Sequence, residues 1–146
     1  MSQVYDGSPG AVLIDTTTIA GTVGVTTVTL TPTQSGTVFI CGKRAAGGVT
    51  INLPDPTISG LKYTFIMKQA AVVAQALTFT SPTANTMAGI WIGATPNVNA
   101  TAQPCATVSV AFTATAQWQD KIELVSANGQ WIAYGVTGVA AGIAFA

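Results

Sequence analysis

Apolar and polar residues alternate along many short stretches of the chain, which is the period of a β-strand with one buried face. The clearest case runs from Leu61 to Met67, where four apolar residues share one face and polar residues occupy the other. Thr, Val, Ile and Phe dominate these stretches, and such residue types favour strands. Further strands are expected over residues 11–14, 25–30, 37–41, 49–53, 76–80, 89–93, 107–113 and 121–136.

Gly, Pro and Asn separate these stretches, and no segment shows a convincing helical period. The pattern predicts a single-domain, all-β fold over residues 11–137. Residues 1–10 are polar and are expected to form an extended N-terminal arm. Residues 95–104 are expected to form a loop. Jelly roll, immunoglobulin-like sandwich and barrel share the same alternation, so the strand order stays open.

The segment 138–146 is uncharged, apolar and rich in Gly and Ala. Chain ends normally fray in water, but this composition favours burial. We expect an apolar C-terminal tail that docks either along its own sheet or on a neighbouring subunit.

The last two strands are expected to form a hairpin around Asn128-Gly129, and the loop length decides which residues share a face. A two-residue loop pairs Leu124 with Ala133, whereas a three-residue loop pairs Leu124 with Ile132. The three-residue loop gathers more apolar residues on one face than the two-residue loop does, so it is the predicted one. It would place Trp131 on the opposite face.

Charge is scarce, since only 7% of residues are Asp, Glu, Lys or Arg and the formal net charge is zero. About 25% is ordinary for a soluble domain. Every apolar run is too short to cross a bilayer as a helix, so no membrane segment is expected. A neutral, apolar surface tends to self-associate, which favours a surface covered by partner subunits. The alternative is that Thr and Asn side chains solvate the surface without charge.

Few residues are available for chemistry. The chain has no His, so Ser-His-Asp and Cys-His catalytic groups are excluded. Cys41 and Cys105 are expected to be small buried side chains rather than a disulfide. We expect no enzyme activity, no cofactor, no metal site and no direct binding of nucleic acid. Trp118 lies between two glutamines and is the tryptophan most expected at a surface. The candidate interface residues are Trp118, Trp131, Val139, Ile143 and Phe145.

Several segments, in this order and spacing, resemble small structural proteins of tailed phages and large DNA viruses. They are residues 30–39 (LTPTQSGTVF), 51–54 (INLP), 60–65 (GLKYTF), 120–125 (DKIELV) and 128–131 (NGQW). The resemblance implies a capsid decoration (cement) protein or a minor capsid protein, made in the host cytoplasm and located on the capsid surface. Such proteins are commonly β-sandwiches or jelly rolls, so we expect a single-domain antiparallel β-sandwich of the jelly-roll kind. It implies a homo-oligomer, with a trimer favoured, that bridges subunits of the major capsid protein or other virion proteins. The alternative is a carbohydrate- or receptor-binding module of a viral fibre or tail appendage, which predicts an exposed aromatic ring beside amide side chains in a groove.

Overall fold

The computed structural model describes residues 11–14, 26–41, 48–68, 76–84, 86–93, 101–139 and 141–146, with the backbone alone for 11–14, 26 and 101–106. Within these residues the chain is all-β, as predicted, and apart from one 3-10 turn at Pro32–Gln34 every regular element is a strand. The expected N-terminal arm, residues 1–10, lies outside the described residues.

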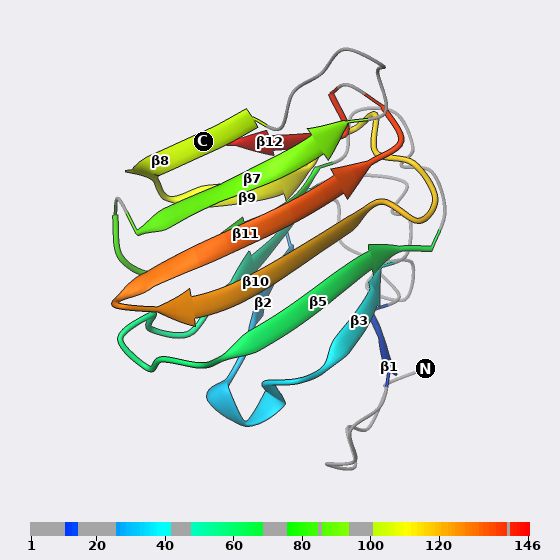
Figure 1. Ribbon diagram of the computed structural model, residues 1–146. Helices are drawn as coiled ribbons and strands as arrows, with labels where there is room; N and C mark the ends of the chain where they lie inside the picture. The colour runs from blue at the N-terminus through cyan, green and yellow to red at the C-terminus, as the bar shows by residue number, and fades with distance from the viewer. Residues whose placement is uncertain are drawn as a thin grey trace.

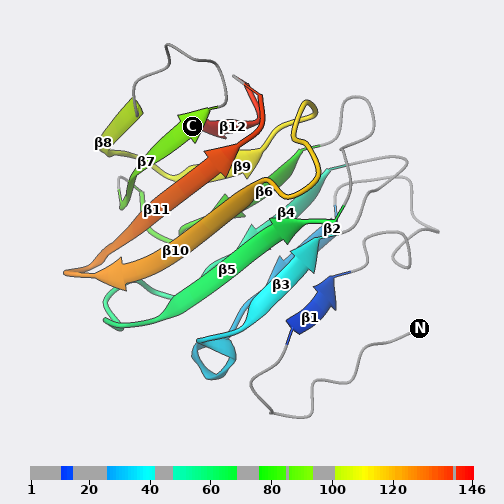
Figure 2. The ribbon, with the colours of Figure 1, turned by 45° about the vertical axis from the view of Figure 1, so that its right-hand side comes forward.

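The strands form two mixed sheets that lie in two layers (Figures 1 and 2). The seven-stranded sheet has the order β1 (Ala11–Ile14), β3 (Val38–Cys41), β5 (Lys62–Met67), β10 (Lys121–Ala127), β11 (Gln130–Thr137), β7 (Met87–Gly93) and β8 (Thr101–Thr107). The five-stranded sheet has the order β12 (Ile143–Phe145), β9 (Ser109–Phe112), β6 (Leu77–Thr80), β4 (Val49–Asn52) and β2 (Thr26–Thr29). Among the strands that the structure describes, neither sheet closes on itself.

The prediction of antiparallel sheets is wrong, because half of the strand pairs in the described part of the chain are parallel. In the first half of the chain, successive strands alternate between the sheets, so the odd strands β1, β3 and β5 pair in parallel in one sheet and β2, β4 and β6 do so in the other. The chain therefore winds as a coil with two strands per turn. Residues paired across neighbouring turns are 23 to 28 positions apart, as in Thr26–Val49 and Val49–Leu77. This mixed arrangement does not confirm a jelly roll.

One hydrophobic core fills the space between the layers. Its centre is a string of aromatic rings that crosses from one sheet to the other. Phe39 stacks on Phe65 in the seven-stranded sheet, and Phe65 meets Phe79 of the five-stranded sheet with ring centroids 4.1 Å apart. These rings come from the apolar faces that the alternation predicted, and their burial stabilises the pairing of the two layers.

The hairpin of β10 and β11 has the shorter loop, so the predicted three-residue loop is wrong. Ala127 pairs with Gln130 and Leu124 pairs with Ala133, and both loop residues have positive φ, 52° at Asn128 and 73° at Gly129. These angles are typical of the type I′ turn, whose twist matches that of the strands. Trp131 therefore lies on the inner face of β11 and is fully buried. The prediction had placed it on the outer face.

The C-terminal segment docks along its own sheet, which is the first of the two expected alternatives. Strand β12 pairs with β9 at the edge of the five-stranded sheet. The carbonyl oxygen of Ala146 accepts hydrogen bonds of 2.9 Å from the backbone N–H groups of Val108 and Ser109.

The expected loop 95–104 overlaps a strand, because Thr101 to Pro104 belong to β8. This strand lies at the edge of the seven-stranded sheet, and its pairing with β7 shifts register between Met87 and Gly89. Proline lacks a backbone N–H group and is tolerated at edges and bulges.

Candidate docking face and hollow

The outer faces of the two sheets carry different side chains. On β2, β4 and β6 the five-stranded sheet presents short polar side chains without charge: Thr27, Thr29, Thr50, Asn52, Thr78 and Thr80. On β9 and β12 the same face carries Ala111 and Ala144. The seven-stranded sheet presents an apolar set on β7, β10 and β11, here called the docking face: Ala88, Ile90, Ile92, Val125, Ile132, Tyr134 and Val136. The two sheets thus differ in how they avoid charge: one carries neutral polar side chains, and the other carries apolar side chains.

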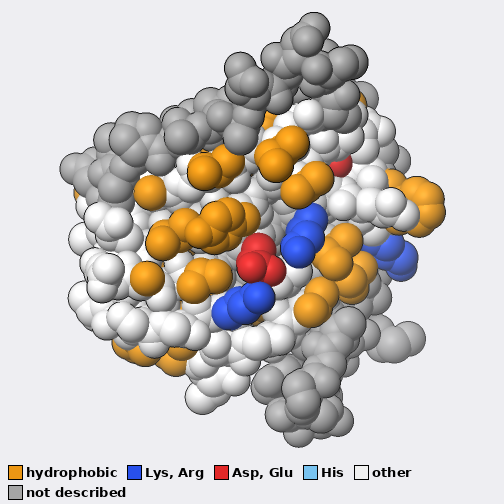
Figure 3. Space-filling view, in the orientation of Figure 1, with side chains coloured by type: hydrophobic (Ala, Val, Ile, Leu, Met, Phe, Trp, Pro, Cys, Tyr) orange, Lys and Arg blue, Asp and Glu red, His pale blue; other side chains and the backbone are white. Residues whose placement is uncertain are grey.

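The docking face is continuous across neighbouring strands. Tyr134 pairs with Ile90, and Val136 pairs with Ile92, so their side chains lie side by side on β11 and β7. All four are large and 40–54% exposed. Figure 3 looks onto this side of the molecule and shows hydrophobic side chains gathered over β7 and β11.

Three charged side chains stand beside this apolar surface, on β5 and β10 (Figure 3). The carboxylate of Glu123 lies 3.3 Å from the amine of Lys62 and 3.6 Å from that of Lys121. Both lysines are about half exposed, so these ion pairs contribute little stability. With two amines and one carboxylate, this group of three side chains carries one net positive charge.

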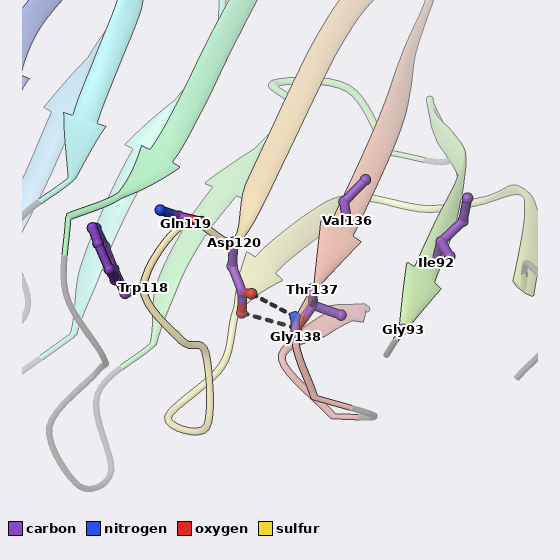
Figure 4. Close-up of a pocket in the computed structure, with 8 residues that line it drawn as sticks. All are labelled: Ile92, Gly93, Trp118, Gln119, Asp120, Val136, Thr137 and Gly138. Carbon is purple, nitrogen blue, oxygen red and sulfur yellow. Dashed lines mark hydrogen bonds between the residues drawn. The ribbon is translucent and has the colours of Figure 1, made fainter. Parts of the chain in front are cut away.

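A hollow of about 380 Å³ opens where β7 and β11 end. Its lining comes from these two strands and from the turn before β10: Ile92, Gly93, Trp118, Gln119, Asp120, Val136, Thr137 and Gly138. Figure 4 shows Trp118 at one side of the hollow and Ile92 at the other, with Asp120 and Gly138 between them.

The side chain of Asp120 links the segments that line the hollow through hydrogen bonds. Its carboxylate is buried, and Oδ2 accepts hydrogen bonds from the Thr137 hydroxyl (2.8 Å) and the backbone N–H of Gln117 (2.7 Å). Oδ1 accepts a hydrogen bond of 2.7 Å from the backbone N–H of Gly138. A buried carboxylate is stable only with such partners. One side chain thus joins the start of β10 to the end of β11.

Trp118 is held at the surface by a tight turn. The backbone N–H of Asp120 donates to the carbonyl of Gln117, and Gln119 has a φ of 72°, as the third residue of a type II turn requires. The backbone N–H of Gln119 donates to the carbonyl oxygen of Met67 at the end of β5. The backbone of the turn is therefore fixed on the sheet, while the Trp118 side chain is 66% exposed.

The predicted interface residues lie in different environments. Trp118 is at the surface, as its polar neighbours indicated. Trp131 and Ile143 are buried in the core, so neither can be a surface contact, and this part of the prediction is wrong. Trp131 fills the space between the sheets, and its Nε1 donates to the carbonyl oxygen of Pro54. Val139 and Phe145 are half-buried, and Phe145 packs against the core.

Sequence reasoning missed the main part of the docking face. The sequence did not indicate that four of its residues are exposed, because apolar residues in a strand are normally expected to face the core. These residues are Ile90, Ile92, Tyr134 and Val136. A signal was present, since Ile90-Trp91-Ile92 is apolar at consecutive positions and a strand directs these to opposite faces. One face or the other had to expose apolar side chains.

The described residues offer little chemistry. They contain no group of three or more His, Cys, Asp or Glu side chains that could hold a metal ion. Burial raises the pKa of Cys41 to about 12, so this thiol stays protonated and unreactive. The side chain of Cys105 is outside the described set. No helix in the described parts of the chain is long and apolar enough to cross a bilayer.

Comparison with known protein families finds no family that matches this chain. Comparison with curated proteins likewise finds no matching relative.

Proposed function

We propose that this chain is a structural subunit of a virion, a capsid decoration (cement) or minor capsid protein that bridges neighbouring capsid subunits through the docking face. The observation that carries the proposal is the contrast between the two outer faces. The face of threonines and asparagine suits water, whereas the apolar face of β7 and β11 suits a partner.

The proposed mechanism is contact area rather than chemistry. Burying apolar surface contributes about 25 cal/mol per Å², from which the costs of association are subtracted. Two sheets on one core, arranged as a β-sandwich, form a rigid support that loses little conformational freedom on binding. Many copies on a closed shell add their contacts through avidity. The proposed partners are the major capsid protein or other virion proteins, with further copies of the chain in a homo-oligomer, a trimer being favoured.

The proposed role of the C-terminal segment is narrower than the sequence suggested. Ile143 is buried and β12 completes the five-stranded sheet, so this segment supports the fold and is not free to bridge subunits. Deleting it would test folding rather than docking. The docking face therefore takes its place as the bridging element.

The location of the chain tests the proposal directly. An antibody raised against the purified protein is applied to particles released from cells that produce it, after separation on a density gradient. We expect the chain to sediment with intact particles and to label their shell faces. A chain found only in the soluble fraction would contradict the proposal, as would labelling confined to an appendage tip.

A matched pair of variants tests the face. We expect Ile90→Lys, on the docking face, to lower retention on particles at least tenfold. Thr78→Lys places the same charge on the outer face of the five-stranded sheet and should bind like the wild type. Equal retention of both variants would remove the docking face from the mechanism.

A further inference from the structure

We propose that the hollow beside Trp118 binds a neutral saccharide, with one pyranose ring lying against the Trp118 indole. This site is distinct from the docking face that is proposed to contact the shell. It uses the turn before β10 and the ends of β7 and β11, and it shares only Ile92 and Val136 with the docking face.

The first argument is the presentation of the ring. Trp118 is the most exposed large hydrophobic side chain among the described residues, yet the backbone beneath it is fixed by the Gln117–Asp120 turn and by Asp120 itself. A ring carried on a fixed backbone leaves less backbone freedom to lose when a ligand binds. An aromatic face offers an apolar platform for the C–H groups of a sugar ring.

The second argument is the chemistry beside the ring. Gln119 lines the hollow, and its side-chain amide has no hydrogen-bond partner within the described structure. An amide offers both donors and an acceptor, which matches the hydroxyl groups at the edge of a sugar. Apolar lining with a few polar groups that set orientation is the usual composition of a small-molecule site.

The third argument is charge. Among the described residues that line the hollow, the one ionisable group is that of Asp120, which is 2% exposed and already accepts three hydrogen bonds. The described lining therefore presents no free charge to a ligand. This favours an uncharged ligand over a phosphate, a carboxylate or a cation.

The fourth argument is size. At about 380 Å³ the hollow is near the lower end of the range for small-molecule sites. Such a volume suits a small ligand better than a segment of helix or strand. These arguments together favour a saccharide over a peptide.

The test is a titration of intrinsic fluorescence with defined neutral oligosaccharides: maltohexaose, cellohexaose, laminarihexaose and chitohexaose, followed by a glycan array. We expect at least one neutral glycan to bind and to shift the emission of the exposed tryptophan. Measured on the array, which does not depend on tryptophan emission, Trp118→Ala should weaken that binding at least tenfold, and Trp118→Phe should weaken it less, because a smaller aromatic face remains.

Gln119→Asn tests the amide. Asparagine tolerates the positive φ of this position, so the turn is kept while the amide is withdrawn by one methylene group. We expect a several-fold loss of affinity. The matched control is Ile90→Lys, which disrupts the docking face and should leave glycan binding unchanged.

Four results would overturn the proposal. Three are silence of the whole array, binding that Trp118→Ala leaves intact, and a preference for anionic glycans such as heparin. The fourth is loss of self-association in Trp118→Ala, measured by sedimentation velocity, because the ring would then contact another protein copy. Trp118→Ala should still bind particles, which separates failure of this site from failure of shell docking.

Discussion

The indole Nε1 of Trp131 donates a hydrogen bond of 3.1 Å to the carbonyl oxygen of Pro54, 77 residues earlier in the chain. The ring itself is fully buried and lies near Tyr63, with centroids 5.7 Å apart. This side chain ties the C-terminal hairpin to the loop that follows β4.

Replacing Trp131 by Phe should therefore destabilise the fold. The change leaves a void and an unpartnered buried carbonyl, and we expect a loss of roughly 2–4 kcal/mol in the free energy of unfolding. Urea unfolding followed by circular dichroism measures it. Trp118→Phe, at an exposed ring, should change the same quantity by less than about 0.5 kcal/mol. Similar losses in both variants would contradict the buried position of Trp131.

Asp120→Asn should destabilise the fold and loosen the turn that carries Trp118. The amide can present only one oxygen to three donors, and hydrogen bonds to a charged group contribute about 1.5–3 kcal/mol each. We expect a loss of roughly 2–4 kcal/mol in urea unfolding, together with lower fluorescence anisotropy of the exposed tryptophan. Asp55→Asn is the control, because this carboxylate is exposed and only accepts a local hydrogen bond from Thr57. An unfolding midpoint that moves as far in the control would argue against a special role for Asp120.

Alkaline pH should weaken the fold through Tyr63. Burial raises the pKa of its hydroxyl from 10.0 to about 12, and the hydroxyl donates to the carbonyl oxygen of Thr31 at 2.8 Å. The unfolded chain releases this proton near pH 10 and the folded chain only near pH 12, so stability falls as pH rises through this window. Cys41 acts in the same direction from pH 9 upward.

Tyr63→Phe isolates the tyrosine's share of this effect. At pH 8 the variant should be less stable by about 1 kcal/mol, because the hydrogen bond to Thr31 is lost. At pH 11 the gap should shrink, since only the wild type is weakened by the tyrosine proton. Urea unfolding at the two pH values gives both differences, and a gap that widens at pH 11 would refute the prediction.

Gly89→Ala should push strands β7 and β11 apart. A Cβ at this position would overlap the carbonyl oxygen of Ala133 on the neighbouring strand β11. We expect a loss of more than about 3 kcal/mol or failure to fold, as is typical of an overlap that the backbone must relieve. Ala88→Gly is the neighbouring control and should cost about 1 kcal/mol or less. Thermal unfolding compares the two, and equal midpoints would contradict this packing.

The positions of the strands could be predicted from the sequence because alternation is a local property. The segment around Phe65 shows this well: its apolar residues are the ones that the structure buries. The pairing of strands could not be predicted in the same way. Nothing in the residues of β3 or β5 distinguishes a parallel neighbour from an antiparallel one, because either places the same face against the core.

The hairpin register was mispredicted for a related reason. Counting apolar residues favoured the face with Tyr134 and Val136, although these two are half exposed. The count fails where a strand is apolar on both faces, because hydrophobicity then no longer identifies the core. Volume and hydrogen bonding decide instead, and Trp131 with its Pro54 partner fills the interior better. Trp118 was placed correctly because its neighbours are polar on both sides.

The winding of the first half of the chain has a consequence for how the protein can change in length. Each turn adds one strand to each sheet and uses 23 to 28 residues. A whole turn could therefore be inserted or removed while β5, β10, β11 and β7 keep their neighbours. A change of half that length would send every later strand to the wrong layer. Insertions tolerated within the coil should thus come in steps of one full repeat.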